Sequence, residues 1–206
     1  MKMIYALIPA KSESRRIKNK NFVRISGKTL FKITLDFAIG SEIFDKVIVS
    51  SDKKTDCPLH SKIVFDLRPK HLARASTTMD RLILYVIKKY KMRNDDVIIL
   101  LQPTSPLRST DDLKKSLSIF FKKRKTVISV ERIKNKEHMF VSTKDGLILL
   151  PYGEIYRQNG AFYIFKVKDF LKNEKIPFDF EPYPMERVNS IDIDEYLDYI
   201  ISLLLI

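Results

Sequence analysis

The sequence predicts an α/β fold in which a mostly parallel, twisted sheet is flanked by helices. Short apolar runs that suit buried parallel strands alternate with segments of helical spacing. Such an alternation favours parallel neighbouring strands joined by right-handed crossovers. The 206 residues are enough for one domain with a full hydrophobic core, so we expect a single domain over residues 1–206.

The alternation fills the first two thirds of the chain. The strand-like runs are Ile4 to Pro9, Lys46 to Ser50, Ile63 to Phe65, Val97 to Leu101 and Val127 to Val130. The helical segments between them are Leu30 to Ile39, Met79 to Tyr90 and Asp111 to Phe121. Thr110 and Asp111 supply an N-cap and an acidic first turn for the last of these helices. In such sheets, ligands bind where loops leave the carboxyl ends of the strands.

After about residue 132 the pattern changes to shorter segments with strand character. They are Met139 to Val141, Leu147 to Leu150 and Ala161 to Phe165, with a turn at Lys144-Asp145-Gly146. Phe178 and Phe180 are spaced as on one packed face of a further strand. A last helix is expected from Glu195 to Leu205.

The composition limits the classes of partner and the compartment. The net charge of +13 suits a polyanion, but we attribute most of it to a lysine-rich surface. The single Cys57 excludes an internal disulfide and leaves no cysteine cluster for zinc. No segment reaches the roughly 18 consecutive apolar residues that a membrane-spanning helix needs. We therefore expect a cytoplasmic protein with no membrane partner.

A basic loop, Pro9 to Asn21, directly follows the first predicted strand. It holds five cationic side chains in thirteen positions. Backbone amides, hydroxyls and cations at such a place can hold a triphosphate. The loop has no glycine, so a solvated basic turn explains the same residues equally well.

A second polar loop, Gln102 to Arg108, follows the apolar run Val97 to Leu101. Two prolines stiffen it, so that Gln102, Thr104 and Ser105 are presented in a fixed geometry. We interpret this loop as part of a site, although a proline-stiffened connection without a ligand has the same pattern.

Two carboxylates alternate in Ser190 to Asp194. Alternation in an extended segment places Asp192 and Asp194 on one face. Neighbouring carboxylates repel each other, and a divalent cation such as Mg²⁺ relieves that repulsion. The alternative role for Asp194 is to cap the last helix, which leaves Asp192 unexplained.

These loops belong to a longer series of motifs that resembles the acylneuraminate cytidylyltransferase family, the CMP-sialic acid synthetases. The series comprises a basic loop ending in Lys20-Asn21, FDKVIVSSD (Phe44 to Asp52), LRP (Leu67 to Pro69), LLQPTSPLR (Leu100 to Arg108), NGAFYI (Asn159 to Ile164) and SIDID (Ser190 to Asp194). The resemblance spans nearly the whole chain. It implies a Rossmann-like nucleotidyltransferase fold, CTP, Mg²⁺ or Mn²⁺, and attack on the α-phosphorus by the anomeric hydroxyl of an acidic nine-carbon sugar.

The resemblance also implies a role for each site residue. The nucleotide contacts would be Lys11, Ser12, Arg15, Lys20, Asn21 and Arg68. The sugar contacts would be Gln102, Thr104, Ser105, Asn159 and Tyr163. Asp192 and Asp194 would hold the metal and, together with Lys20, form the catalytic set.

The sequence departs from the family pattern at several positions. Lys11 and Arg16 stand where relatives have Arg and Gly. Relatives have a longer arm and an Arg several residues before the NGA motif, whereas Pro151-Tyr-Gly153 contains no Arg. We expect a homodimer formed through a short β-rich arm around residues 137–156, weaker than the dimers of relatives.

Three alternatives stay open at the level of sequence. The first is a related nucleotidyltransferase with another acidic sugar or another nucleotide, which the missing Arg motivates. The second is a nucleic-acid-binding module, motivated by the charge of +13; no RNP-like or helix-turn-helix signal supports it, so we expect no nucleic-acid partner. The third is an inactive relative that still binds nucleotide, which Lys11 and Arg16 motivate and the intact Asp192 and Asp194 oppose.

Overall fold

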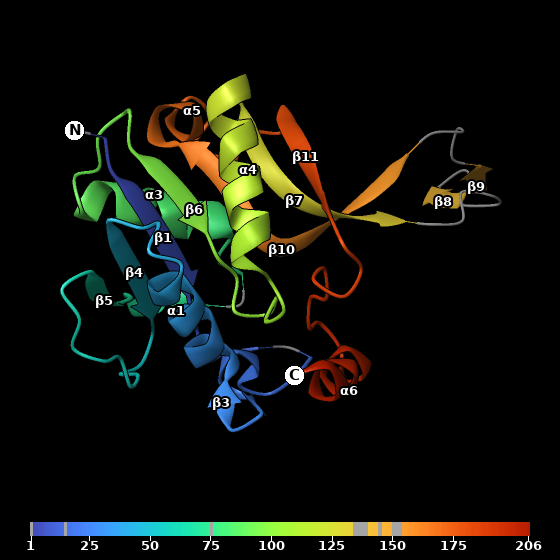
Figure 1. Cartoon of the computed structure of the whole chain (residues 1–206), viewed down its shortest axis with the longest axis horizontal. Coiled ribbons are helices and arrows are strands. Elements are labelled where there is room, and N and C mark those ends of the chain that lie inside the picture. Colours follow the sequence, from blue (N-terminus) through green and yellow to red (C-terminus); the bar gives the residue numbers. More distant parts are fainter. Residues whose placement is uncertain (1, 15, 75, 134–139, 144–145, 150–153) are drawn as a thin grey trace.

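The computed structural model describes residues 2–14, 16–74, 76–133, 140–143, 146–149 and 154–206. Its main feature is a seven-stranded sheet in the order β11-β7-β10-β6-β1-β4-β5, with helices on both faces (Figure 1). The elements are β1 (Ile4–Pro9), η1 (Lys20–Phe22), β2 (Arg24–Ile25), β3 (Lys28–Thr29), α1 (Leu30–Gly40), β4 (Lys46–Ser51), β5 (Ile63–Leu67), α2 (Lys70–Ala73), α3 (Met79–Lys89), β6 (Val97–Leu100), α4 (Thr110–Lys123), β7 (Thr126–Ile133), β8 (Phe140–Thr143), β9 (Gly146–Leu149), β10 (Ile155–Lys166), α5 (Val167–Leu171), β11 (Phe180–Met185) and α6 (Tyr196–Leu205).

The sheet is mostly parallel, so the predicted fold class is confirmed. β1 pairs in parallel with β4 and β6, β4 with β5, and β7 with β11. β10 is the exception, because it runs antiparallel between β6 and β7. The carboxyl ends of β1, β4, β5 and β6 therefore meet at one edge of the sheet, where the loops identified in the sequence emerge.

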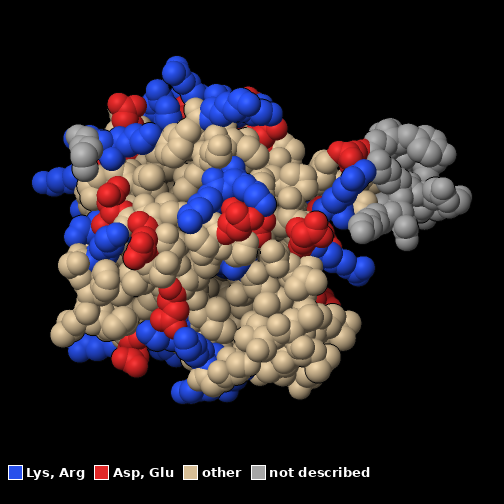
Figure 2. Space-filling model, in the orientation of Figure 1, with Lys and Arg blue, Asp and Glu red and all other residues tan. Residues whose placement is uncertain are grey.

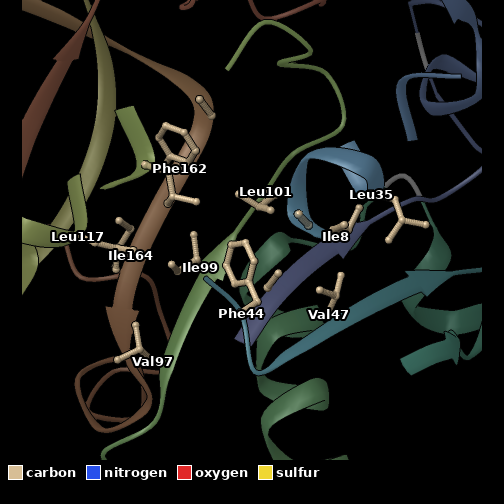
Figure 3. Close-up of a cluster of buried hydrophobic side chains, with 14 of the residues drawn as sticks. Ile8, Leu35, Phe44, Val47, Val97, Ile99, Leu101, Leu117, Phe162 and Ile164 are labelled. Carbon is tan, nitrogen blue, oxygen red and sulfur yellow. The ribbon is translucent and has the colours of Figure 1, made fainter. Parts of the chain in front are cut away.

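The hydrophobic core consists of two layers, one on each face of the sheet. Ala6 and Ile8 of β1 pack with α1 and α4, whereas Leu7 packs with α3 and α5. β6 divides its side chains in the same way, since successive residues of a strand point to opposite faces. Figure 3 shows the first layer, in which Ile99 lies near Phe44 and Phe162. This double burial explains why the strands read as continuous apolar runs.

Several predicted boundaries and contacts were wrong in detail. The N-cap of α4 is Ser109 rather than Thr110: Ser109 has extended backbone angles, and its side chain accepts a hydrogen bond from the amide of Asp112. Phe180 opens β11, but Phe178 lies before that strand with 85% of its surface exposed, so the two do not share a packed face. The predicted turn at 144–146 lies largely outside the described residues.

Strands β8 and β9 pair antiparallel and project from the body of the molecule (Figure 1). They correspond to the arm expected around residues 137–156. The face shown in Figure 2 carries Lys and Arg over several elements, interspersed with Asp and Glu, and has no single basic stripe. Within the described part of the chain, no helix is long and apolar enough to cross a membrane.

Candidate active site

A cleft of about 360 Å³ opens at the carboxyl ends of the parallel strands. Pro9 at the end of β1, Arg68 after β5 and Gln102 after β6 all border it. This is the edge at which open α/β sheets bind their ligands. The predicted site residues that line the cleft are Lys11, Lys20, Asn21, Arg68, Gln102, Thr104, Asp192 and Asp194.

The basic loop is closed on itself by hydrogen bonds. The side-chain amide of Asn21 is buried and donates to the carbonyl of Lys11 at 2.8 Å. The amide of Lys20 donates to the hydroxyl of Ser14 at 3.2 Å. Ser12 does not line the cleft, because its amide and hydroxyl both donate to Asp52, at 2.7 and 2.5 Å. Arg15, also expected to contact the nucleotide, lies outside the described residues.

Asp192 is the most unusual carboxylate of the cleft. It is largely buried, and its Oδ1 has no hydrogen-bond partner among the described residues. Burial raises the pKa of Asp192 and the charge of Asp194 raises it further, against the opposing effects of Thr104, Lys20 and Arg108. The segment is fixed by the amide of Ile193, which donates to the carbonyl of Thr104 at 2.8 Å. A carboxylate that borders the cleft therefore has one buried oxygen without a hydrogen bond from the described residues, which makes Asp192 a candidate to accept a proton or bind a cation.

Asp194 lies in the opposite electrostatic environment. Its Oδ1 is 2.8 Å from Nζ of Lys20, and its Oδ2 is 3.1 Å from Nη1 of Arg16. Partial burial raises the pKa of Asp194, but the hydrogen bond and charge of Lys20, together with Arg16, outweigh it and hold the pKa below its usual value. Asp194 does not cap α6 as proposed from the sequence, since the N-cap is Glu195.

The loop after β6 is held by a buried cation. Arg108 donates from Nε to the carbonyl of Ser105 at 2.8 Å, from Nη1 to that of Ala161 at 3.2 Å, and from Nη2 to that of Gln102. Burial lowers the pKa of Arg108 to about 9, while the charge of Asp192 opposes that shift. The loop is therefore fixed by this clamp as well as by its prolines. Sequence reasoning included Arg108 in a motif but gave it no role.

Two residues expected to contact a sugar turn inward instead. Ser105 is fully buried and donates to the carbonyl of Asn159 at 2.7 Å. Asn159 accepts from the hydroxyl of Ser129 at 2.6 Å and donates to that of Ser190 at 3.1 Å. These bonds join β7, β10 and the segment that carries the carboxylates. Asn159 also borders a neighbouring cavity of about 320 Å³ that contains Asp192 and Asp194.

Gln102 connects the cleft to a third hollow, of about 240 Å³, which is lined largely by apolar side chains. Tyr163 borders this hollow, and its hydroxyl donates to Gln158 at 3.3 Å. Burial raises the pKa of Tyr163 to about 12, and the charge of Asp192 adds to the shift. Gly160 makes room for Gln102: it has φ +71°, and a Cβ there would lie 2.8 Å from Oε1 of Gln102.

The cleft also contains residues that sequence reasoning missed. Thr77, Thr78 and Met79, at the start of α3, form one wall. Thr78 is the N-cap, with its hydroxyl accepting from the amide of Arg81. The threonine pair just before a helical segment was the available signal, because it is typical of a helix N-terminus. The backbone amides at the N-terminus of α3 give this wall a partial positive charge.

Known proteins with related sequences support the motif assignments. The family model described as cytidylyltransferase matches residues 5–203. The chain is 28% identical to the N-acylneuraminate cytidylyltransferase of Escherichia coli over 213 residues, which are 95% of this chain and 50% of that protein. It is also 28% identical to the CMP-N,N'-diacetyllegionaminic acid synthase of Legionella pneumophila over 220 residues, which are 97% of this chain and 94% of that protein.

The fold has counterparts among solved structures. A 4-diphosphocytidyl-2C-methyl-D-erythritol synthase superposes with a TM-score of 0.71 and 13% identity, covering 100% of both chains. At that identity the likeness shows the fold alone. The residues that match the family model, 5–203, include every residue that lines the cleft, from the basic loop to the paired carboxylates. The chain belongs to the cytidylyltransferase family, as the resemblance of its motifs indicated.

Proposed function

We propose that the protein transfers CMP from CTP to the anomeric hydroxyl of a nonulosonic acid and releases pyrophosphate. The observation that carries the proposal is the cleft itself, which is lined both by the cations Lys11, Lys20 and Arg16 and by Asp192, whose buried Oδ1 has no partner among the described residues. The relatives named for CMP-sialic and CMP-legionaminic acid chemistry support the choice of nucleotide and sugar class.

In the proposed reaction, a bond forms between the anomeric oxygen and the α-phosphorus of CTP as the bond from that phosphorus to the pyrophosphate oxygen breaks. Such a transfer needs alignment and charge neutralisation more than covalent participation by the protein. Lys11, Lys20 and Arg16 are suited to neutralise the triphosphate. Arg68 and Asn21 also line the cleft, and we assign the part of the cleft beside Arg68 to the nucleoside.

A divalent cation fits the carboxylate pair. The free Oδ1 of Asp192 and the half-exposed carboxylate of Asp194 are hard oxygen ligands on one cleft. Mg²⁺ or Mn²⁺ held there would neutralise phosphate charge. Lys20 and Arg16 neutralise Asp194 in the protein without ligand, and both cations are long enough to turn toward a triphosphate instead.

The protein's own residues also suggest how the proton is handled. The raised pKa of Asp192 makes its carboxylate a better proton acceptor than an ordinary aspartate. We infer that one carboxylate of the Asp192 and Asp194 pair helps to take up the proton of the attacking hydroxyl. The apolar hollow beside Gln102 and Tyr163 is suited to an acyl substituent of the sugar.

The proposed reaction is tested by pyrophosphate release with CTP, UTP and ATP against sialic, legionaminic, pseudaminic and 3-deoxy-octulosonic acids. We expect turnover with CTP and at least one nine-carbon acid, loss of turnover in EDTA, and recovery with Mg²⁺ or Mn²⁺. Turnover only with the eight-carbon acid or only with another nucleotide would support the alternative nucleotidyltransferase. No turnover with any pair would contradict the proposal.

Lys20→Ala should lower kcat/KM by a factor on the order of 100, because it removes a cation from the triphosphate site. Lys122→Ala is the matched control, since Lys122 is an exposed lysine in the last turn of α4, at the opposite end of that helix from the loop that borders the cleft. It should change kcat/KM by less than about twofold. Equal losses in the two variants would mean that the basic charge acts diffusely, as a nucleic-acid-binding module requires.

Asp192→Asn should lower kcat by a factor on the order of 100 or more, yet raise Tm at neutral pH in metal-free buffer. The pKa of Asp192 is raised in the folded protein, so its contribution to stability is present below the ordinary value of 3.8 and lost as the pH rises through the raised pKa. The gain in Tm should therefore vanish in acid. Asp194→Asn should have the opposite sign, because the pKa of Asp194 is lowered. A lower Tm in Asp192→Asn at neutral pH contradicts this assignment.

We also propose a homodimer that dissociates on dilution. The projecting β8–β9 pair supports it, as do the exposed apolar residues of α6, among them Leu197 and Leu204, with 68% and 82% of their surfaces exposed. Light scattering over a dilution series should show dissociation, and Leu204→Glu should weaken the dimer more than Leu59→Glu, an exposed leucine elsewhere. A monomer at all concentrations would remove the dimer.

A further inference from the structure

A carboxylate outside the cleft is connected to it by hydrogen bonds. Asp66 lies in β5 and is completely buried. Its Oδ1 accepts from Nζ of Lys89 at 2.6 Å, from the hydroxyl of Tyr85 at 3.2 Å and from that of Tyr90 at 3.3 Å. Its Oδ2 accepts from the hydroxyl of Ser50 at 2.7 Å. A buried charge with four donors is held in one orientation, because each donor would be lost if the carboxylate turned.

Ser50 passes this orientation on to Arg68. A serine hydroxyl has one proton, and here the proton is directed to Asp66, so the oxygen is left to accept. It accepts from Nε of Arg68 at 3.2 Å, and the carbonyl of Ser50 accepts from Nη2 of Arg68 at 2.8 Å. One edge of the guanidinium is thus fixed to β4, while Nη1 makes no hydrogen bond to the described residues. The same side chain lines the cleft.

The charges favour the same arrangement. Burial lowers the pKa of Arg68, and the nearby carboxylates of Asp52 and Asp66 oppose that effect. Asp52 also anchors the start of the basic loop through Ser12. Asp66 is therefore a counter-charge for Arg68 that acts through one intervening hydroxyl, and its direct partner Lys89 comes from α3 on the other side.

We propose that Asp66 is a positioning residue for nucleotide recognition: through Ser50 it aims the free edge of the Arg68 guanidinium at the nucleoside end of the cleft. The inference rests on the proposed function, since it takes CTP as the ligand. The proposal depends on the direction of the Ser50 hydroxyl bond: its proton points to Asp66, so its oxygen accepts from Arg68. An amide at position 66 can donate to Ser50, which turns the hydroxyl proton toward Nε of Arg68 and replaces an acceptor by a second donor.

The test compares Asp66→Asn, Ser50→Ala and the control Asp96→Asn. Asp96 is also a buried carboxylate, but it accepts from the amides of Met3 and Arg93 at the opposite end of the sheet. Calorimetry should show a Kd for CTP about 10-fold higher in the first two variants. In turnover assays the KM for CTP should rise by a similar factor while the KM for the sugar stays within about twofold. A double variant that combines Asp66→Asn with Ser50→Ala should lose no more CTP affinity than either of these two single variants.

The outcomes separate this inference from the proposed function. If the wild-type protein does not bind CTP, both fall together. If it binds CTP and the first two variants bind equally well, the inference alone is overturned. A loss of CTP affinity in Asp96→Asn matching that in Asp66→Asn would show a purely structural effect and also overturn it. Should Asp66→Asn not fold, Ser50→Ala decides, because it keeps Asp66 with the three donors on Oδ1 and the backbone bond to Nη2 of Arg68, and removes only the hydroxyl that joins Asp66 to Nε of Arg68.

Discussion

The site depends on one buried cation, the guanidinium of Arg108. Transferring a charge out of water costs several kcal/mol in practice unless other groups replace its hydration. Three backbone carbonyls do so here, from Gln102 and Ser105 in the loop after β6 and from Ala161 in β10. Because Arg108 forms no ion pair among the described residues, these carbonyls cannot move without leaving the charge unsolvated. The clamp thereby fixes the antiparallel strand β10 against the loop whose Gln102 borders both the cleft and the apolar hollow.

The two carboxylates of the cleft lie in contrasting environments, and the charge of Arg108 reduces that contrast by opposing the raised pKa of Asp192. Asp192 and Asp194 are separated by one residue, and both line the cleft. Burial dominates the environment of Asp192, with Arg108 as a nearby but indirect countercharge. Asp194 is half exposed and paired with Lys20 and Arg16. One carboxylate thus has a raised pKa and the other a lowered one, an arrangement that assigns different chemical tasks to neighbouring groups of the same type.

The sequence predicted the parallel strands and the shared edge of the loops that follow Ile4 to Pro9 and Val97 to Leu101, because both follow from local patterns and general sheet topology; only the family resemblance added Ser190 to Asp194 to the same site. A wholly apolar run signals a strand buried on both faces, and the loops after parallel strands share one edge. It did not predict the directions of Ser105 and Asn159, since a polar residue beside a strand gives no sign of whether its partner is a ligand or another strand. Asp66 was missed for a similar reason, as its partner Lys89 is brought to it only when α3 packs on the sheet.

Three cations of the cleft, Lys20, Arg16 and Arg68, already have partners in the protein without ligand. Lys20 and Arg16 neutralise Asp194, and Arg68 is bound by Ser50. In the proposed reaction a triphosphate would compete with Asp194 for Lys20 and Arg16, and its binding would leave Asp194 in need of a new cation. Metal and triphosphate would then favour each other's binding, because each relieves the charge that the other exposes. Arg16, which stands where the family resemblance implies a glycine, adds a second cation to the ion pair of Asp194 and would strengthen this coupling.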